Sequence, residues 1–173
     1  ASTPGAPCPN VVWQIMPARR LWTHRTLASE VTRHRPDVLF VPAHVIPFVL
    51  PPHRLPPSVV TIHDLGYHVF PETHSRQQRL YLKWSTRWSA WAATRLIAVS
   101  TATADDLWRL DGADRRKTDV IHEATVPAQP VSSDQIAQIR QRYALARPYA
   151  LFVGTLQPRK NLIRLVTAYQ ALA

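Results

Sequence analysis

The stretch LIAVSTATADDL, residues 96–107, predicts a strand that runs directly into a helix. Residues 96–99 are a short apolar run of the kind found in buried strands. Ser100 follows at the position of a helix N-cap. Asp105 and Asp106 lie in or just after the first predicted turn, near the positive end of the helix dipole. This stretch therefore predicts one strand-to-helix unit of an α/β protein.

The same alternation continues on both sides of this unit. Further strands are predicted at 37–41, 59–62, 119–122 and 149–153, and further helices at 20–34, 75–94, 132–143 and from Asn161 onward. Short apolar strands that alternate with helices indicate a parallel sheet covered on both faces, as in a Rossmann-like fold. Ligands of such sheets gather at the carboxyl ends of the strands.

A proline-containing segment, residues 124–131, separates two parts of the chain and is typical of a linker. We therefore expect one domain over residues 1–128. A second domain over residues 129–173 is expected to be truncated, because the chain ends on its first strand-to-helix unit.

Composition limits the classes of partner and compartment. The 173 residues carry a formal net charge of +10, which favours nucleic acid, phosphate-bearing small molecules or an acidic membrane surface without choosing among them. Cys8 is the only cysteine, so neither an internal disulfide nor a thiolate metal cluster can form. No apolar run approaches the ~20 residues of a spanning helix. With no signal-peptide pattern at the start, these features predict a cytoplasmic protein.

The segment from Gly154 to Asn161 combines the parts of an anion site. Gly154 ends a predicted strand and allows close approach to the backbone. Asn161 opens a helix whose first N–H groups favour an anion. Arg159 and Lys160 add two cations at the same place. These parts could clamp a diphosphate, or they could form a plain basic turn. The glycine spacing of the P-loop and of the dinucleotide fingerprint is absent.

His63 and Asp64 follow the predicted strand at 59–62. Such a pair could be an acid/base couple, half of a metal site, or a structural feature. Metal phosphohydrolases of the His-Asp type carry the pair on a helix, so that class is rejected. His44 lies in a proline-rich loop, where it is either exposed or borders a ligand pocket. Ser100 is explained as a helix cap, with a role in the cleft as the lesser alternative.

Aromatic residues form a stripe along the predicted helix at 75–94. Tyr81, Trp84, Trp88 and Trp91 fall three, four and three residues apart. Aromatic residues at helical spacing usually face the core, and we expect that here. The alternative is a membrane-surface or stacking face.

Three stretches resemble family-4 glycosyltransferases of the GT-B architecture. These are LFVGTLQPRKNL at 151–162, VVTIHDL at 59–65, and residues 96–100 leading into Asp106-Leu107. In that family the first stretch opens the donor domain. The resemblance implies that Gly154, Thr155, Arg159 and Lys160 face the diphosphate of a nucleotide-sugar. It also implies that His63, oriented by Asp64, contacts the transferred sugar or the acceptor.

The resemblance implies an enzyme that moves a hexose from a nucleoside-diphosphate sugar to a saccharide or lipid-linked acceptor. Retention of configuration is implied, and neither a metal nor a further cofactor is needed. A peripheral contact with the anionic inner face of a membrane is compatible with it, and no nucleic-acid partner is expected.

The sequence also departs from the family pattern. A first strand with a Gly-rich loop is not recognisable before Val11, and the pair of Glu residues of the donor domain is missing. Residues 120–124 stand where an Asn-Gly turn is common. We therefore expect this chain alone to be inactive, because the family's catalysis needs both halves of the cleft. The rival hypotheses are a basic α/β module that binds nucleic acid and a non-catalytic interaction domain.

Overall fold

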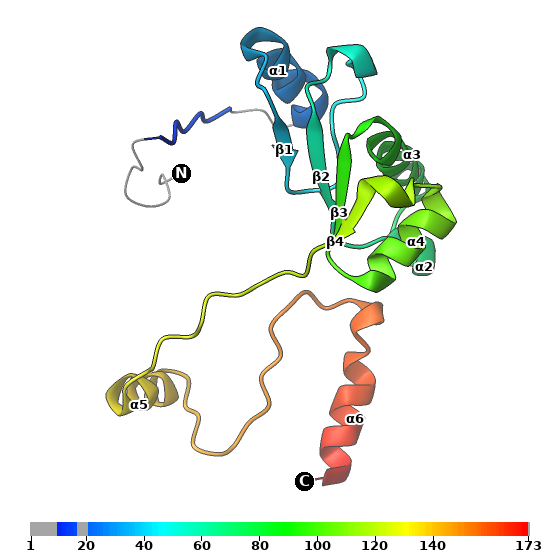
Figure 1. Cartoon of the computed structure of the whole chain (residues 1–173). Coiled ribbons are helices and arrows are strands. Elements are labelled where there is room, and N and C mark those ends of the chain that lie inside the picture. Colours follow the sequence, from blue (N-terminus) through cyan, green and yellow to red (C-terminus); the bar gives the residue numbers. More distant parts are fainter. Residues whose placement is uncertain (1–9, 17–20, 173) are drawn as a thin grey trace. The chain divides into compact units, whose positions relative to one another are not determined.

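The computed structural model describes residues 10–16 and 21–172 (Figure 1). The chain divides into two compact units, Ala1–His122 and Glu123–Ala173.

The first unit is built on a parallel sheet of four strands. Its strands are β1 (Leu39–Val41), β2 (Ser58–Ile62), β3 (Arg95–Ala98) and β4 (Thr118–Val120), in the spatial order β1-β2-β3-β4. Val60 of β2 pairs with Val41 on one side and with Leu96 on the other. Every neighbouring pair is parallel, so the predicted α/β fold with a parallel sheet is confirmed.

Helices connect the strands of this unit. They are η1 (Trp22–Leu27), α1 (Ala28–His34), η2 (Pro52–Arg54), α2 (Gly66–Val69), η3 (Pro71–Thr73), α3 (Arg76–Ala92), α4 (Thr101–Asp111) and η4 (Arg115–Lys117). The helix predicted at 20–34 starts with a π-helical segment before α1, and Arg20 lies outside the described residues. The helix ends at Arg35, whose φ of 42° breaks the helical path before Pro36.

Two predicted helix starts are held by side-chain caps. The Ser75 hydroxyl accepts a hydrogen bond from the Gln78 amide, and the Gln78 side chain accepts one from the Ser75 amide, so α3 begins with a capping box. Ser100 caps α4 in the same way through the amide of Thr103, at 3.1 Å. The cap predicted for Ser100 is therefore confirmed.

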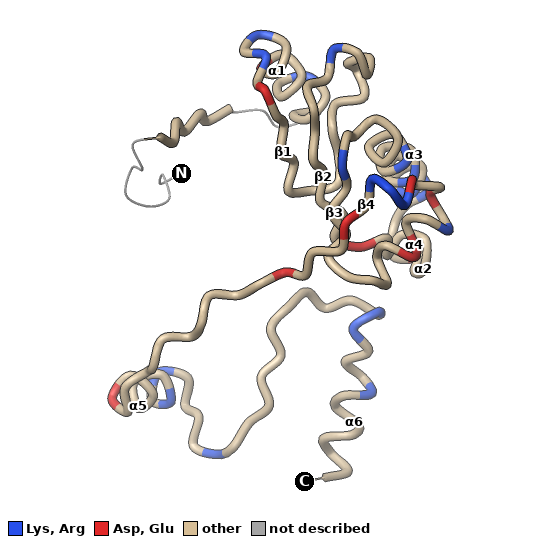
Figure 2. Tube along the Cα trace, in the orientation of Figure 1, with Lys and Arg blue, Asp and Glu red and all other residues tan. Residues whose placement is uncertain are grey.

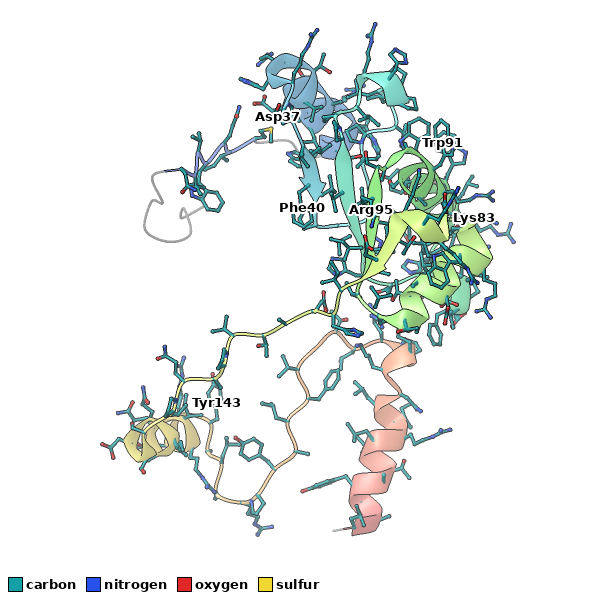
Figure 3. All side chains as sticks on the ribbon, in the orientation of Figure 1. Asp37, Phe40, Lys83, Trp91, Arg95 and Tyr143 are labelled. Carbon is teal, nitrogen blue, oxygen red and sulfur yellow. The ribbon has the colours of Figure 1, made fainter. Side chains whose placement is uncertain are left out.

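The core lies on one face of the sheet. Side chains that alternate along the strands on this face are buried, namely Leu39, Val41, Val60, Ile62, Leu96 and Ala98. Phe40 points to the other face and is 58 % exposed (Figure 3). The ion pair of Arg95 with Asp119, at 2.7 Å, lies on that second face too. Phe40, Arg95 and Asp119 therefore form an exposed part of this second face.

The aromatic stripe of α3 does not form the core as predicted. Trp84 is 58 % exposed and Trp91 62 % exposed, and Tyr81 is exposed as well, whereas Trp88 packs partly against the core. The face that packs inward carries small residues instead, Ser85, Ser89 and Ala90. The Ser89 hydroxyl accepts from the Ile46 amide at 3.2 Å. Small side chains let α3 approach its neighbours closely, so the bulky residues face outward.

The second unit contains α5 (Ser133–Arg142), η5 (Pro158–Lys160) and α6 (Leu162–Leu172). Ser132 and Gln135 form a capping box at the start of α5, where the sequence predicts that a helix begins. The strand predicted at 149–153 is not formed, and Val153 is 83 % exposed. A strand is stabilised by ladder hydrogen bonds with a neighbour, and the described residues offer these five none.

A buried polar cluster joins α2 to α4. The Tyr67 hydroxyl donates to the buried Asp111 carboxylate at 3.2 Å, and His68 Nε2 lies 3.3 Å from both carboxylate oxygens. Burial, followed by the nearby Asp111 carboxylate, raises the pKa of Tyr67, so the phenol keeps its proton and remains a donor. The cluster therefore depends on one carboxylate that accepts from two side chains.

Replacing Asp111 should destabilise this unit. In Asp111→Ala the buried Tyr67 hydroxyl loses its acceptor, and we expect the free energy of unfolding to fall by about 1–3 kcal/mol. Urea unfolding followed by tryptophan fluorescence measures this change. The matched control is Asp106→Ala, which removes the surface ion pair with Arg109 on the same helix and should cost less than about 1 kcal/mol. Equal losses in both variants would contradict the cluster's role.

Candidate functional site

Polar side chains follow each strand of the sheet at its carboxyl end. His63 comes directly after β2, Ser100 and His122 come two residues after β3 and β4, and His44 comes three residues after β1. Because the strands are parallel, their carboxyl ends meet at one edge of the sheet. This edge is the candidate site of the first unit.

His63 and His44 lie together at this edge. Their ring centroids are 5.6 Å apart. The His63 ring places Nε2 2.6 Å from the carbonyl oxygen of Pro42, and a carbonyl can only accept, so Nε2 carries the proton. The amide of His44 donates to the Thr61 carbonyl at 3.0 Å, which ties the loop after β1 to β2.

The environment of His44 favours its neutral form. Burial lowers the pKa of His44, and the neighbouring His63 lowers it further, while Asp64 opposes both effects. A neutral imidazole has one donor and one acceptor nitrogen, so it can serve a sugar hydroxyl in either direction. His44 is therefore suited to a polar, uncharged ligand.

Asp64 supports the turn that follows β2. Its Oδ1 accepts from the Gly66 amide at 2.9 Å, which fixes the backbone at the start of α2. The Pro42 carbonyl gives the His63 ring one orienting contact, which the sequence did not indicate. The structure thus places Asp64 beside His63 along the chain and assigns its carboxylate a local backbone contact.

Ser100 is linked to the backbone of His63 through Thr103. The Thr103 hydroxyl donates to the His63 carbonyl at 3.2 Å and lies 3.0 Å from the Ser100 hydroxyl. Since the Thr103 proton goes to His63, the Ser100 hydroxyl donates to Thr103. The start of α4 and the end of β2 are therefore held by one chain of hydrogen bonds.

His122 is a member of this edge that sequence reasoning missed. Its Nδ1 lies 3.1 Å from the Val99 carbonyl, so it is anchored next to the start of α4. A signal was present, because His122 is the last residue of the strand predicted at 119–122. Three histidines, His44, His63 and His122, thus follow three of the four strands.

The candidate anion site of the second unit is the turn from Gly154 to Asn161. Gly154 has a φ of 156°, and a Cβ there would lie 3.0 Å from the Phe152 ring, so a larger residue would be strained at this position. Thr155, Arg159 and Lys160 are exposed, and Arg159 Nε donates to the Gln157 side chain at 2.8 Å. Asn161, with a φ of 50°, precedes α6 and its carbonyl accepts from Leu165. The first turn of α6 holds no acidic residue, which leaves its positive end available to an anion.

Among residues 10–16 and 21–172, no three His, Cys, Asp or Glu side chains are grouped so that they could hold a metal ion. No helix there combines the length and the apolar character that crossing a bilayer requires.

Comparison with known proteins identifies the family. The sequence model of Glycosyltransferase Family 4 matches residues 4–128, which is most of the chain. This chain belongs to glycosyltransferase family 4. The O-antigen chain mannosyltransferase B of Escherichia coli is 34 % identical over 126 residues, which cover 70 % of this chain and 32 % of that protein. The chain thus spans about a third of the length of this curated relative.

The residues matched by the family model include one of the two candidate sites and not the other. They contain the whole strand-end edge, with His44, His63, Ser100 and His122. They end before residues 149–162, on which the most specific part of the resemblance was based. The family-4 assignment therefore rests on the first unit.

The depressed pKa of His44 predicts how stability depends on pH. Folding lowers the pKa of His44 from its usual 6.5, so His44 binds a proton more weakly in the folded state than in the unfolded state. Stability should therefore fall as the pH drops below about 6.5. Buried His24, whose pKa burial also lowers, contributes with the same sign. His44→Asn, which suits the φ of 37°, should reduce this fall without abolishing it.

Urea unfolding between about pH 7.5 and about pH 5 measures the slope. The control is His53→Asn, an exposed residue of η2. An identical slope in His44→Asn and in the parent chain would contradict the burial effect.

Proposed function

We propose that this chain is the acceptor-side domain and the first donor-side elements of a retaining glycosyltransferase. The enzyme moves a hexose from a nucleoside-diphosphate sugar to a saccharide or lipid-linked acceptor. The observation that carries this proposal is the edge of the family-4 domain where His44, His63 and His122 follow three parallel strands. Mannose is the proposed hexose, because the relative from Escherichia coli is named as a mannosyltransferase.

His63 is the proposed contact to the reacting sugar or the acceptor. Its ring is held by the Pro42 carbonyl at 2.6 Å and its backbone by Thr103 at 3.2 Å. A side chain fixed at both ends loses little freedom when it binds, which favours precise positioning. Asp64 supports His63 through the turn into α2, and His44 and Ser100 border the acceptor.

Arg159 and Lys160 are the proposed groups for the donor diphosphate. The bond that breaks in the transfer joins the sugar to the diphosphate, so negative charge builds on the departing phosphate oxygens. Two exposed cations at the start of α6 stabilise that charge, and Gly154 and Thr155 allow the phosphates to approach the backbone. The nucleotide-sugar is the co-substrate, and the proposal involves no further cofactor.

We also propose that the chain consists of one domain and the beginning of a second. Residues 1–128 form the acceptor-side domain, and residues 129–173 begin the donor-binding domain. The match covers 32 % of the relative from Escherichia coli, and on that ground the 173 residues alone are proposed to be inactive. A cytoplasmic location suits a nucleotide-sugar donor.

The test is turnover of the full-length protein that contains this chain, with a panel of nucleoside-diphosphate hexoses. Arg159→Ala should lower kcat/KM by ~10²–10³-fold, because a charge contact that grows in the transition state is lost. The matched control is Arg147→Ala, an exposed arginine outside this turn, which should stay near the parent value.

His63→Ala should lower turnover by ~10²-fold while the fold is retained, with at most the loss of one hydrogen bond to the Pro42 carbonyl, and His53→Ala serves as its control. Full activity of both Arg159→Ala and His63→Ala would overturn the proposed site. No turnover with any hexose donor would overturn the proposed function itself.

A further inference from the structure

A cavity lies at the amino ends of β1 and β2, at the opposite end of the sheet from the strand-end edge. Its lining comes from two segments: residues 31–37, which end α1 and lead into β1, and residues 53–57, which lead from η2 into β2. The cavity has a volume of about 750 Å³. Pockets for small organic ligands typically measure ~300–1,000 Å³, so this one has the size of a ligand site.

The two segments that line the cavity are held in place by the backbone. The Leu39 amide donates to the Pro57 carbonyl at 2.9 Å, which ties the start of β1 to the residue before β2. The Arg54 amide donates to the Pro51 carbonyl at 2.9 Å and closes the turn of η2. Pro57 and two other prolines of the lining have a fixed φ. The walls are therefore ordered before a ligand binds, which lowers the entropy lost on binding.

Basic side chains line the cavity from both segments. Arg35 belongs to the first segment, and His53 and Arg54 belong to the second. All three are exposed, and among residues 10–16 and 21–172 neither arginine forms an ion pair. Figure 2 shows Lys and Arg at the end of α1 and in the loop before β2, at the same end of the sheet. Guanidinium groups on two walls can hold the oxygens of one phosphate group between them.

The rest of the lining favours a sugar over a nucleotide base. Asp37, at the start of β1 (Figure 3), is the one acidic residue among those that line the cavity, and a carboxylate accepts hydrogen bonds from hydroxyl groups. Val31 and Leu55 add apolar surface for the C–H groups of a sugar ring. The lining contains no Phe, Tyr or Trp on which a base would stack. The cavity thus combines cations for a phosphate with an acceptor for hydroxyls.

We propose that this cavity binds a hexose phosphate. Arg35 and Arg54 hold the phosphate group from opposite walls, with His53 beside them, and Asp37 accepts a hydroxyl of the sugar. The cavity lies at the other end of the sheet from His63, so it is separate from the proposed transfer site. The inference therefore does not rest on the transfer reaction.

Isothermal titration calorimetry of the whole chain with mannose 6-phosphate tests this proposal. The affinity should be at least about tenfold higher than for inorganic phosphate or for mannose, because only the sugar phosphate uses both kinds of contact. Guanosine monophosphate should bind more weakly than mannose 6-phosphate, since its base has no stacking partner in the cavity.

Replacing the two arginines should weaken the binding of mannose 6-phosphate. In Arg35→Asn combined with Arg54→Ala, the affinity should fall at least about tenfold because charge-assisted hydrogen bonds are lost. Asparagine suits the φ of 42° at position 35. The matched control is Arg25→Ala with Arg33→Ala, which removes two exposed cations of η1 and α1 that do not line the cavity. This control should bind like the parent chain.

Asp37→Ala should change the two affinities in opposite directions. Binding of mannose 6-phosphate should weaken, because a hydroxyl loses its acceptor, whereas binding of inorganic phosphate should strengthen, because a like charge is removed. A variant that only disturbed the fold would weaken both. Since all altered side chains are exposed, the urea midpoints should equal that of the parent chain.

Several outcomes would overturn the proposal. Affinity for mannose 6-phosphate that does not exceed the affinity for inorganic phosphate, or that is unchanged in the arginine variant, would show that the cavity is not a sugar-phosphate site. Loss of binding in His63→Ala, or in Arg159→Ala with Lys160→Ala, would assign the probe to one of the two candidate sites described above. Neither result would affect the proposed transfer reaction, because binding is measured without turnover.

Discussion

The parallel pairing of β2 with β3 is the constraint on which the first unit depends. Ile62 stands opposite Ala98, so the two strands end side by side and the chain leaves both at the same level. The Val99 amide continues the ladder to the Ile62 carbonyl at 3.3 Å. From that point His63 and Ser100 diverge and are joined again through Thr103. The proximity of these residues is therefore a product of strand register, and no local signal between them is required.

The sequence predicted the local elements better than their surroundings. Caps at Ser100 and Ser132 could be found because a cap involves residues only three apart. The prediction of a strand at residues 149–153 was wrong. An apolar run indicates only a preference for extended backbone, whereas a strand also needs hydrogen bonds to an adjacent strand. The prediction that the aromatic stripe on α3 faces the core was wrong for another reason. Periodicity defines two opposite faces, and the small residues Ser85 and Ser89 repeat as regularly as the tryptophans do.

In the candidate site, too, features set by neighbouring residues could be predicted, and contacts between residues far apart in the sequence could not. His63 was found because it follows a strand, and the position of ligands in parallel sheets is a general rule. The carbonyl of Pro42 lies 21 residues away along the chain, and its contact with His63 depends on how the loop after β1 folds back. The family match over residues 4–128 includes the strand-end edge, whereas the basic turn at Gly154 lies outside the matched residues.

The hydroxyl of Thr103 has an evolutionary consequence. It contacts the Ser100 hydroxyl at the cap of α4 and the His63 carbonyl after β2. Two separate hydrogen bonds therefore restrict which residues can replace Thr103. Serine preserves the hydroxyl and is tolerated by both. Valine has nearly the same shape and volume as threonine but lacks the hydroxyl oxygen. A change to valine would therefore lose both hydrogen bonds, although the position is buried and would accept its volume. Among descendants of this sequence, position 103 should therefore vary in size before it varies in polarity.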